Sequence, residues 1–267
     1  MTHPVSAISF HACSEGTAKS LLSSLNYQLE AAVDAFYVRG GGGYVGAKPS
    51  PSSTRSGRRT GSSSGGTTSA AAARATEAKL NALFDTYADA EDPDAILVEG
   101  TERLCADLEV APDDVAVLVL AYHLQCPRMC EFRRAGWLAG WTALGCDGLP
   151  AMRRAVAGMA ASLNDPDRFK DVYRFAFGFA KGPQGKSLVL PMAIAVWELL
   201  LRGRYPELDL WTTFLVEQHG KAISKDTWNL FLDFTRTAKP GFPDHDTDGA
   251  WPILIDQFVE YAREHVP

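Results

Sequence analysis

The sequence predicts an all-α protein, and two observations support that fold class. From residue 76 onward, apolar residues recur at helical spacing in about ten segments. The alternation of apolar and polar residues that marks strands between tight turns is nearly absent. The chain has 267 residues, of which 46% are hydrophobic and 22% are charged, so it can form one large domain or two modest ones. A fibrous or wholly disordered protein is excluded.

Residues 1–39 are predicted to form a very small three-helix bundle. Two short amphipathic stretches occur there, one after Thr17 as N-cap and the other after Asn26. Phe10 supplies a further apolar anchor. Because ~35 residues bury little surface, a bundle of this size is marginally stable on its own.

Residues 40–75 are predicted to form a flexible, disordered linker. Nine of these 36 residues are glycine, eight are serine and none is acidic. Such a segment has too little apolar surface to offset the entropy that it would lose on ordering. Its Gly41, Gly43 and Gly46 match the spacing of a dinucleotide-binding loop, but no strand is predicted before them and no helix directly after. The match therefore indicates no phosphate site.

Residues 76–267 form the predicted main domain, with Thr76 as the cap of its first helix. Capping or acidic residues stand at several later starts, for example Ser224. Residues 115–124 are apolar nearly all round and residues 169–179 are crowded with aromatic side chains, which places both at the predicted centre of the domain. The further predicted helices cover residues 98–108, 113–125, 131–144, 149–162, 168–181, 190–202, 206–219, 225–236 and 251–263.

Charge and apolar content exclude several classes of function. The whole chain carries −6; the linker contributes +5 and residues 1–39 contribute −1, which leaves −10 on residues 76–267. A domain this acidic lacks the basic footprint of a nucleic-acid binder. The longest mostly apolar stretch, residues 188–201, is shorter than the roughly 20 residues of a spanning helix, and the first residues lack the features of a secretory signal. We expect no nucleic-acid partner, no membrane span, and a location in the cytoplasm and nucleus.

The five cysteines are an odd number in a chain large enough to fold without disulfides, so we expect reduced, mostly buried thiols. His123, Cys126 and Cys130 would align on an unbroken helix as three zinc ligands. Pro127 is predicted to end that helix, and structural zinc needs a fourth ligand, so thiols in a core or pocket are favoured. We expect no metal and no cofactor.

No common catalytic motif of a metalloprotease, a P-loop nucleotidase or a serine hydrolase is present. An enzyme with Cys130 as nucleophile stays an alternative, because its partner residues need only meet in space. That alternative requires surroundings that stabilise a thiolate, and the sequence shows none.

Asp244, Asp246 and Asp248 followed by Gly249 match the opening of a calcium-binding loop. The twelfth position, which should be a bidentate glutamate, is Ile255. An acidic turn before the last helix is therefore the favoured interpretation, and a calcium-responsive helical protein is the alternative function.

Aspartates accumulate in the last forty-two residues of the chain. They form either a solvated acidic face, which is the simpler interpretation, or a docking surface for a basic partner. The six residues are Asp226, Asp233, Asp244, Asp246, Asp248 and Asp256.

Several strings of residues match one known family, in the order in which that family has them. They are CEF at 130–132, LGCD at 144–147, RFKD at 168–171, MAIA at 192–195, KDTWNL at 225–230, LDF at 232–234, DGAWP at 248–252 and LID at 254–256. The chain thereby resembles the DCN-like (defective in cullin neddylation) proteins over residues 80–264, the domain called PONY or DCUN. The family also carries a ubiquitin-associated (UBA-like) bundle, which residues 1–39 resemble, with Tyr27 where a tryptophan is expected.

The resemblance implies a scaffold-type co-ligase that makes no bond itself. Such proteins hold a cullin and the conjugating enzyme that carries the ubiquitin-like modifier together, while a RING subunit directs transfer to a cullin lysine. Holding two partners in one geometry raises their effective concentration without a nucleophile, base or metal. The UBA-like part adds ubiquitin as an expected partner.

The resemblance also implies two sets of binding residues. The winged-helix end of the cullin would dock on Asp226, Ala250 and Asp256. The N-acetylated methionine of the conjugating enzyme would enter an apolar groove, where Thr101 stands in place of a larger aliphatic residue. The residues of that groove would be Val98, Thr101, Val117, Leu120, Ala121, Leu124, Phe132, Phe179 and Leu199.

Overall fold

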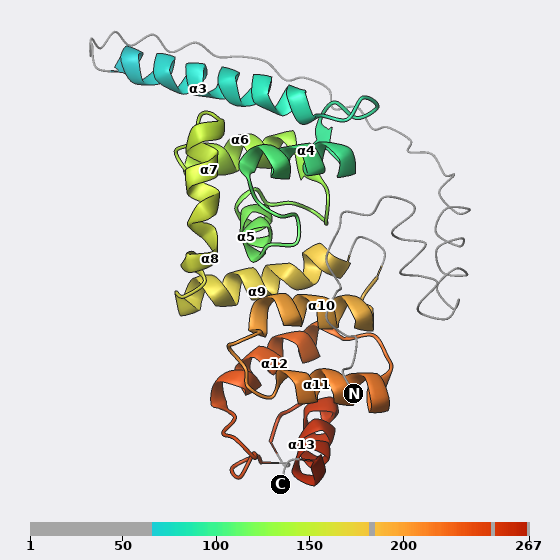
Figure 1. Cartoon of the computed structure of the whole chain (residues 1–267). Helices are drawn as coiled ribbons and strands as arrows, with labels where there is room; N and C mark the ends of the chain where they lie inside the picture. Colours follow the sequence, from blue (N-terminus) through green and yellow to red (C-terminus); the bar gives the residue numbers. More distant parts are fainter. Residues whose placement is uncertain (1–65, 182–184, 247–248, 266–267) are drawn as a thin grey trace, which may run out of the picture. The chain divides into compact units, whose positions relative to one another are not determined.

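The computed structural model describes residues 66–181, 185–246 and 249–265 (Figure 1). These residues form eleven α-helices, a short π-helix and one two-stranded sheet. The predicted all-α class is confirmed. The three-helix bundle predicted for residues 1–39 and most of the predicted linker lie outside the described residues.

From residue 66 on, the chain runs through the following elements, labelled as in Figure 1. They are α3 (Gly66–Tyr87), β1 (Ala95–Ile96), α4 (Val98–Leu108), α5 (Val115–His123), β2 (Phe132–Arg133), α6 (Arg134–Ala143), α7 (Leu149–Ala157), α8 (Met159–Ser162), α9 (Pro166–Lys181), α10 (Leu190–Leu201), α11 (Leu208–Phe214), the π-helix η1 (Leu215–His219), α12 (Lys225–Thr237) and α13 (Ile253–His265). Among the described residues, no helix is both long and apolar enough to cross a bilayer.

Helix α3 begins ten residues earlier than predicted. Its start at Gly66 makes residues 66–75 helical, so the linker prediction is wrong for that part of residues 40–75. The reason is the alanine-rich run of residues 70–75, because alanine has the highest intrinsic helix propensity. The glycine and serine content of the segment as a whole hid this local preference.

The small sheet is a feature that the sequence did not predict. Phe132 and Arg133 pair antiparallel with Ile96 and Ala95, so the helix predicted over residues 131–144 begins only at Arg134. A left-handed backbone at Cys130, with φ of 54°, turns the chain into this pairing. Strands of two residues are too short to show an alternating pattern.

Two predicted helices are interrupted in the structure. Gly158 separates α7 from α8 within the helix predicted over residues 149–162, as the low helix propensity of glycine allows. The segment predicted over residues 206–219 divides into α11 and the π-helix η1. The other predicted helices of the main domain are confirmed to within a few residues at each end.

Helices α5 and α9 lie at the centre of the compact unit that includes residues 76–265, as predicted. Helix α5 packs against α6, α7, α8 and α9, so its apolar side chains are covered on several sides. A Cβ on Gly140 of α6 would lie 2.6 Å from the His123 carbonyl oxygen, so only glycine permits this close approach of α6 to α5. Helix α9 also packs against α10 and α12, and it separates α4 and α5 from α10 to α13 in Figure 1.

Buried tryptophans join helices that are far apart in sequence. The Trp137 indole N–H of α6 donates to the Leu80 carbonyl oxygen of α3 at 3.0 Å. On the other side of α9, the Trp197 indole N–H donates to the Tyr173 hydroxyl at 2.7 Å, and that hydroxyl donates to the Trp228 carbonyl oxygen at 2.9 Å. The Trp228 indole N–H donates back to the Tyr173 carbonyl oxygen at 2.9 Å. These bonds connect α9, α10 and α12 within the core.

Replacing Tyr173 by phenylalanine removes the hydroxyl at the centre of this network and creates no cavity. We expect the free energy of unfolding to fall by about 2 to 3 kcal/mol, because the Trp197 N–H and the Trp228 carbonyl each lose a buried partner. Urea denaturation followed by tryptophan fluorescence measures the change. Tyr261→Phe is the matched control, since its hydroxyl bonds the exposed Glu217 and its loss should change stability much less. Equal losses for the two variants would contradict the assigned role of Tyr173.

Candidate functional site

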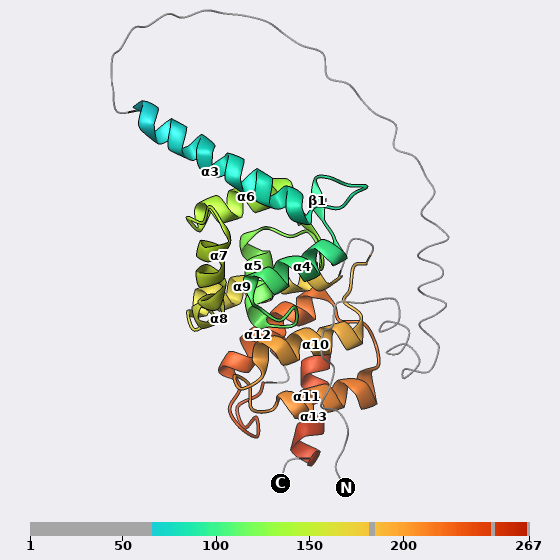
Figure 2. The same cartoon turned by 45° about the horizontal axis from the view of Figure 1, so that its top comes forward.

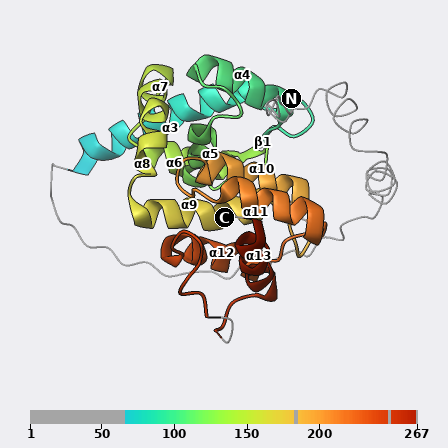
Figure 3. The same ribbon diagram turned by 60° about the horizontal axis from the view of Figure 1, so that its bottom comes forward.

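The predicted cullin-binding residues lie at the starts of the last two helices. Asp226 is exposed in the first turn of α12, whose N-cap, Ser224, accepts a hydrogen bond from the Thr227 N–H at 3.0 Å. Ala250 is exposed just before α13, and Asp256 stands in the first turn of α13. Helices α12 and α13 pack side by side (Figure 3).

A histidine that the sequence did not single out fixes one of these residues. The His245 Nε2 lies 2.8 Å from the Asp256 Oδ1, and the His245 side chain is only 4% exposed. Its ring stacks with Trp251 at 6.3 Å and meets the Phe234 ring edge-on at 5.9 Å. The partners lie eleven residues apart, across an irregular loop, so no periodic pattern in the sequence indicates the pair.

Ala250 and Asp256 lie near each other about the start of α13, whereas Asp226 lies at the start of α12, away from the end of that helix that contacts Trp251. Trp251 packs against Phe234 of α12 with ring centroids 5.8 Å apart. Asp226 precedes Phe234 by eight residues, or about 12 Å along the helix axis. Ile253, which is 74% exposed one turn before Asp256, adds an apolar side chain to this surface. We name Asp226, Ala250 and Asp256 the acidic patch.

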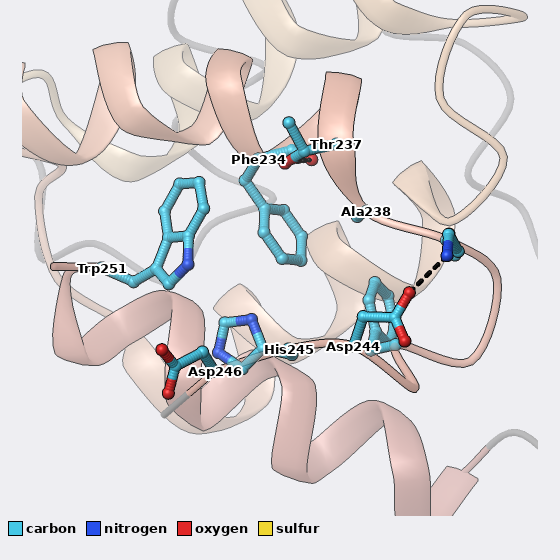
Figure 4. Close-up of a pocket in the computed structure, with 9 residues that line it drawn as sticks. Phe234, Thr237, Ala238, Asp244, His245, Asp246 and Trp251 are labelled. Carbon is cyan, nitrogen blue, oxygen red and sulfur yellow. Dashed lines mark hydrogen bonds and ion pairs between the residues drawn. The ribbon is translucent and has the colours of Figure 1, made fainter. Parts of the chain in front are cut away.

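A pocket of about 260 Å³ lies beside the acidic patch (Figure 4). Figure 4 shows the rings of Phe234, His245 and Trp251 around one space, with Asp244 on the other side of that space. Asp244 forms an ion pair with Lys239, and both side chains are largely exposed. We name this the aromatic pocket; its lining residues are Phe234, Thr237, Ala238, Lys239, Phe242, Asp244, His245, Asp246 and Trp251.

The second predicted set of residues lies on α4, α5, β2, α9 and α10. Five of its members are buried, namely Thr101, Leu120, Ala121, Leu124 and Phe132. Val98 is exposed, and the remaining three, Val117, Phe179 and Leu199, are half-buried. The set therefore ranges from fully buried to exposed side chains. We name these nine residues the apolar groove.

The elements that carry the apolar groove adjoin one another. In Figure 2, α4 and α5 lie on one side of α9, and α10 lies on its other side. Helix α9 packs against both α5 and α10. The pairing of Phe132 with Ile96 brings β2 next to the residues that lead into α4, two positions before Val98. Residues that are far apart in the sequence are therefore carried by elements that lie next to one another.

Thr101 is a polar residue in otherwise apolar surroundings. It is 5% exposed, and its Oγ1 has no hydrogen-bond partner within the described part of the chain. A buried hydroxyl without a partner costs about 1 to 3 kcal/mol. The sequence showed only that a threonine stands there, and the missing partner became evident from the structure.

The residues considered for zinc do not form a metal centre in the described ranges, and the alternative of an enzyme with Cys130 as nucleophile stays a prediction. His123 ends α5 and Cys126 follows three residues later, beyond the helix. Burial raises the pKa of the Cys105 thiol to about 11 and raises the pKa of the Cys126 thiol as well, which opposes thiolate formation. Within residues 66–181, 185–246 and 249–265, no three histidine, cysteine or acidic side chains are grouped for a metal ion.

The calcium-loop alternative is only partly covered by the structure. Asp244 is engaged with Lys239, while Asp248 lies outside the described residues. Ile255, at the position of the expected bidentate glutamate, is fully buried in the core. The alternative stays a prediction that a calcium titration can decide.

Comparison with known proteins identifies relatives of this chain. The family described as "Cullin binding" matches residues 151–261. The chain is 35% identical over 188 residues to DCN1-like protein 4 of Drosophila melanogaster, which covers 70% of this chain and 76% of that protein. It is 40% identical over 191 residues to DCN1-like protein 3 of Homo sapiens, covering 70% and 62%. Defective in cullin neddylation protein 1 of Mycosarcoma maydis is 32% identical over 302 aligned residues, covering 94% and 90%.

Replacing Thr101 by valine tests whether its hydroxyl lacks a partner. We expect the free energy of unfolding to rise by about 1 kcal/mol, because an isosteric apolar group removes the cost of the unpaired Oγ1. Thr235→Val is the control: its Oγ1 donates to the Leu232 carbonyl oxygen at 2.8 Å, so that variant should lose about 0.5 to 1 kcal/mol. Chemical denaturation measures both changes. A loss of stability in both variants would show that Thr101 has a partner.

Proposed function

This chain belongs to the DCN1-like family of cullin-binding proteins, and we propose that it acts in cullin neddylation as a scaffold that holds a cullin and a conjugating enzyme together. The observation that carries the proposal is the acidic patch, with Asp226 and Ala250 exposed and Asp256 oriented by His245. The names of the relatives, which refer to DCN1 and to cullin neddylation, support it.

The acidic patch is proposed to bind the winged-helix end of a cullin. Its two carboxylates suit a basic partner, because complementary charge steers association and selects the orientation of binding. The His245 bond holds Asp256 in one orientation, so less side-chain entropy is lost when a partner binds. Ala250 leaves room for the approach of the partner's backbone, since its side chain is only a methyl group.

The apolar groove is proposed to bind the N-acetylated methionine of the conjugating enzyme. A free terminal ammonium would cost several kcal/mol to bury without a partner, whereas acetylation leaves a neutral amide that one hydrogen bond can satisfy. The unpaired Thr101 hydroxyl is a buried polar group available for such a bond. Helices on which a site is built hold their side chains more rigidly than loops do.

The proposal gives this chain no bond-making step. The RING subunit and the conjugating enzyme would carry out the transfer, and the scaffold would raise their effective concentration at the cullin. Residues 1–39, which resemble a UBA-like bundle, are proposed to add ubiquitin as a partner. A cytoplasmic and nuclear location is part of the same proposal.

The triple variant Asp226→Asn, Ala250→Arg and Asp256→Asn tests the acidic patch. We expect the affinity for a cullin C-terminal fragment to fall by about a hundredfold or more. Each of the three substitutions makes the charge of the patch one unit more positive, and the patch then repels a basic partner. The amide at position 256 can still bond His245, so the local fold is kept. Isothermal titration calorimetry with the full chain measures the affinity.

A control triple makes the same change of charge elsewhere, at Glu77→Gln, Glu91→Gln and Ala111→Arg, which are all exposed. It should bind the cullin fragment as the wild type does. Unchanged cullin affinity in a folded patch variant would refute the assignment of the acidic patch.

Peptides from the N-terminus of the conjugating enzyme test the apolar groove. We expect the acetylated peptide to bind at least about a hundredfold more tightly than the free-amine peptide, since several kcal/mol of ammonium burial separate them. Val117→Arg, at the half-buried rim, should remove the preference. Ala121 is unsuitable for this test because it is 1% exposed and an arginine there would disrupt the core. Val216→Arg, at an exposed site on η1, is the control. Equal calorimetric affinities of the wild type for both peptides would contradict the groove without affecting the acidic patch.

A further inference from the structure

We infer that the aromatic pocket binds one lysine or arginine side chain of the partner that docks on the acidic patch. The inference rests on the proposed function for the identity of that partner, a cullin. It adds a second binding element, next to the patch, with its own chemistry. Asp226, Ala250 and Asp256 do not line the pocket, whereas Asp244 and Asp246, two of the six aspartates of the acidic face, do.

The walls of the pocket are built from aromatic rings that face different directions. The Phe234 ring stacks on Phe242 at 5.6 Å, with 19° between the planes. The plane of the Phe234 ring makes an angle of 81° with that of Trp251 and 85° with that of His245, so both contacts are edge-on. The rings of Phe234, His245 and Trp251 lie around one space (Figure 4). A cation near ring faces is attracted by the negative potential of their π-systems.

The rim of the pocket carries two carboxylates and one ammonium group, that of Lys239, so its net charge is negative. Asp244 and Asp246 both line it. Asp244 already holds an ammonium group, that of Lys239 in the same loop. Because both members of this ion pair are largely exposed, the pair contributes little to stability and can be exchanged for another cation. Lys239 therefore shows in the protein itself which chemistry the rim accepts.

The pocket and the acidic patch share a boundary. Trp251 of the pocket wall directly follows Ala250 of the patch in sequence. His245, also in the wall, bonds Asp256 of the patch at 2.8 Å. A partner that covers Ala250 and Asp256 will therefore lie next to two residues of the pocket wall. A side chain from such a partner reaches the pocket without a second contact surface.

The size of the pocket fits one long side chain. Its volume of 260 Å³ equals roughly nine water molecules of liquid volume. Lysine and arginine have apolar stems that pack along aromatic surface, and a charged end that stays near carboxylates at a rim. An aliphatic side chain would use the rings but make no charge contact with the Asp244 carboxylate, which Lys239 pairs with in the free protein. Charge complementarity therefore favours a basic occupant over an apolar one.

A small probe tests the pocket independently of any cullin. n-Butylguanidinium imitates an arginine side chain, and n-butylurea has a similar shape without the charge. We expect n-butylguanidinium, and not n-butylurea, to shift the indole N–H signal of Trp251 saturably in NMR spectra of the full chain. Equal binding of both compounds would overturn the inference, because the pocket would then select for apolar shape only.

Two substitutions change the rim in opposite directions. Asp244→Asn should weaken n-butylguanidinium binding about three- to fivefold, the effect expected for one exposed charge pair. Lys239→Met should strengthen it by a similar factor, because the competing ammonium is removed. The matched controls, Glu264→Gln and Lys221→Met, make the same charge changes at exposed positions that do not line the pocket and should leave binding unchanged. A failure of Asp244→Asn to weaken binding would overturn the inference.

The same four variants are then titrated with the cullin C-terminal fragment. We expect Asp244→Asn to weaken cullin binding and Lys239→Met to strengthen it, with both controls unchanged. If the probe binds as expected while the cullin affinities do not move, the pocket holds cations but does not contribute to docking, and the inference is wrong. If the wild type does not bind cullin at all, the proposed function fails, and the docking inference fails with it. The probe result then still decides whether the pocket is a cation site, so the two failures are distinguishable.

Discussion

Two hydrogen bonds that run in opposite directions between Tyr173 and Trp228 fix α9 against α12 in the core. The Tyr173 hydroxyl donates to the Trp228 carbonyl, and the Trp228 indole donates to the Tyr173 carbonyl. Burial raises the pKa of Tyr173 well above its usual value, so the hydroxyl keeps the proton that it donates. Trp197 completes the set, and its ring stacks on that of Trp228 at 4.9 Å. Because each of these polar groups is buried, only one arrangement of α9, α10 and α12 satisfies them all.

The position of both proposed binding surfaces follows from that arrangement. Helix α9 contributes Phe179 to the apolar groove and Tyr173 to the buried network, while α12 contributes Trp228 to the network and Phe234 to the aromatic pocket. The same packing therefore sets the distance between groove and patch. A scaffold that acts by positioning needs such rigidity, because a freely moving second site would lower the effective concentration that it creates. The aromatic pocket, in turn, depends on the loop between α12 and α13, which His245 ties to Asp256.

Polar groups in apolar surroundings mark the places where packing alone does not account for the sequence. The Thr101 hydroxyl is buried without a partner in the described structure, although valine would fill the same volume. His245 is almost wholly buried between Phe234 and Trp251, yet its Nε2 faces a carboxylate of the acidic patch. An ordinary core would place apolar residues at both positions. Each residue adjoins a surface that we propose to bind a partner, which gives a physical reason for the polar side chain.

Helical periodicity by itself determined the fold class and the approximate bounds of most helices, because the spacing of apolar residues along a helix is a local property. The strings of residues shared with DCN-like proteins were likewise sufficient to indicate the family, and both sets of binding residues that the resemblance implies stay predictions. The tertiary structure alone decided the pairing of Phe132 with Ile96 and the bond between His245 and Asp256, whereas the early start of α3 at Gly66 reflects a local alanine-rich run that the composition of residues 40–75 obscured. It also showed which of the nine residues proposed for the apolar groove are buried and which are accessible. The sheet pairing and the His245 bond depend on contacts between segments distant in sequence. The helix propensity of the alanine run is masked by the surrounding glycine and serine residues. Neither kind of feature leaves a periodic signal along the chain.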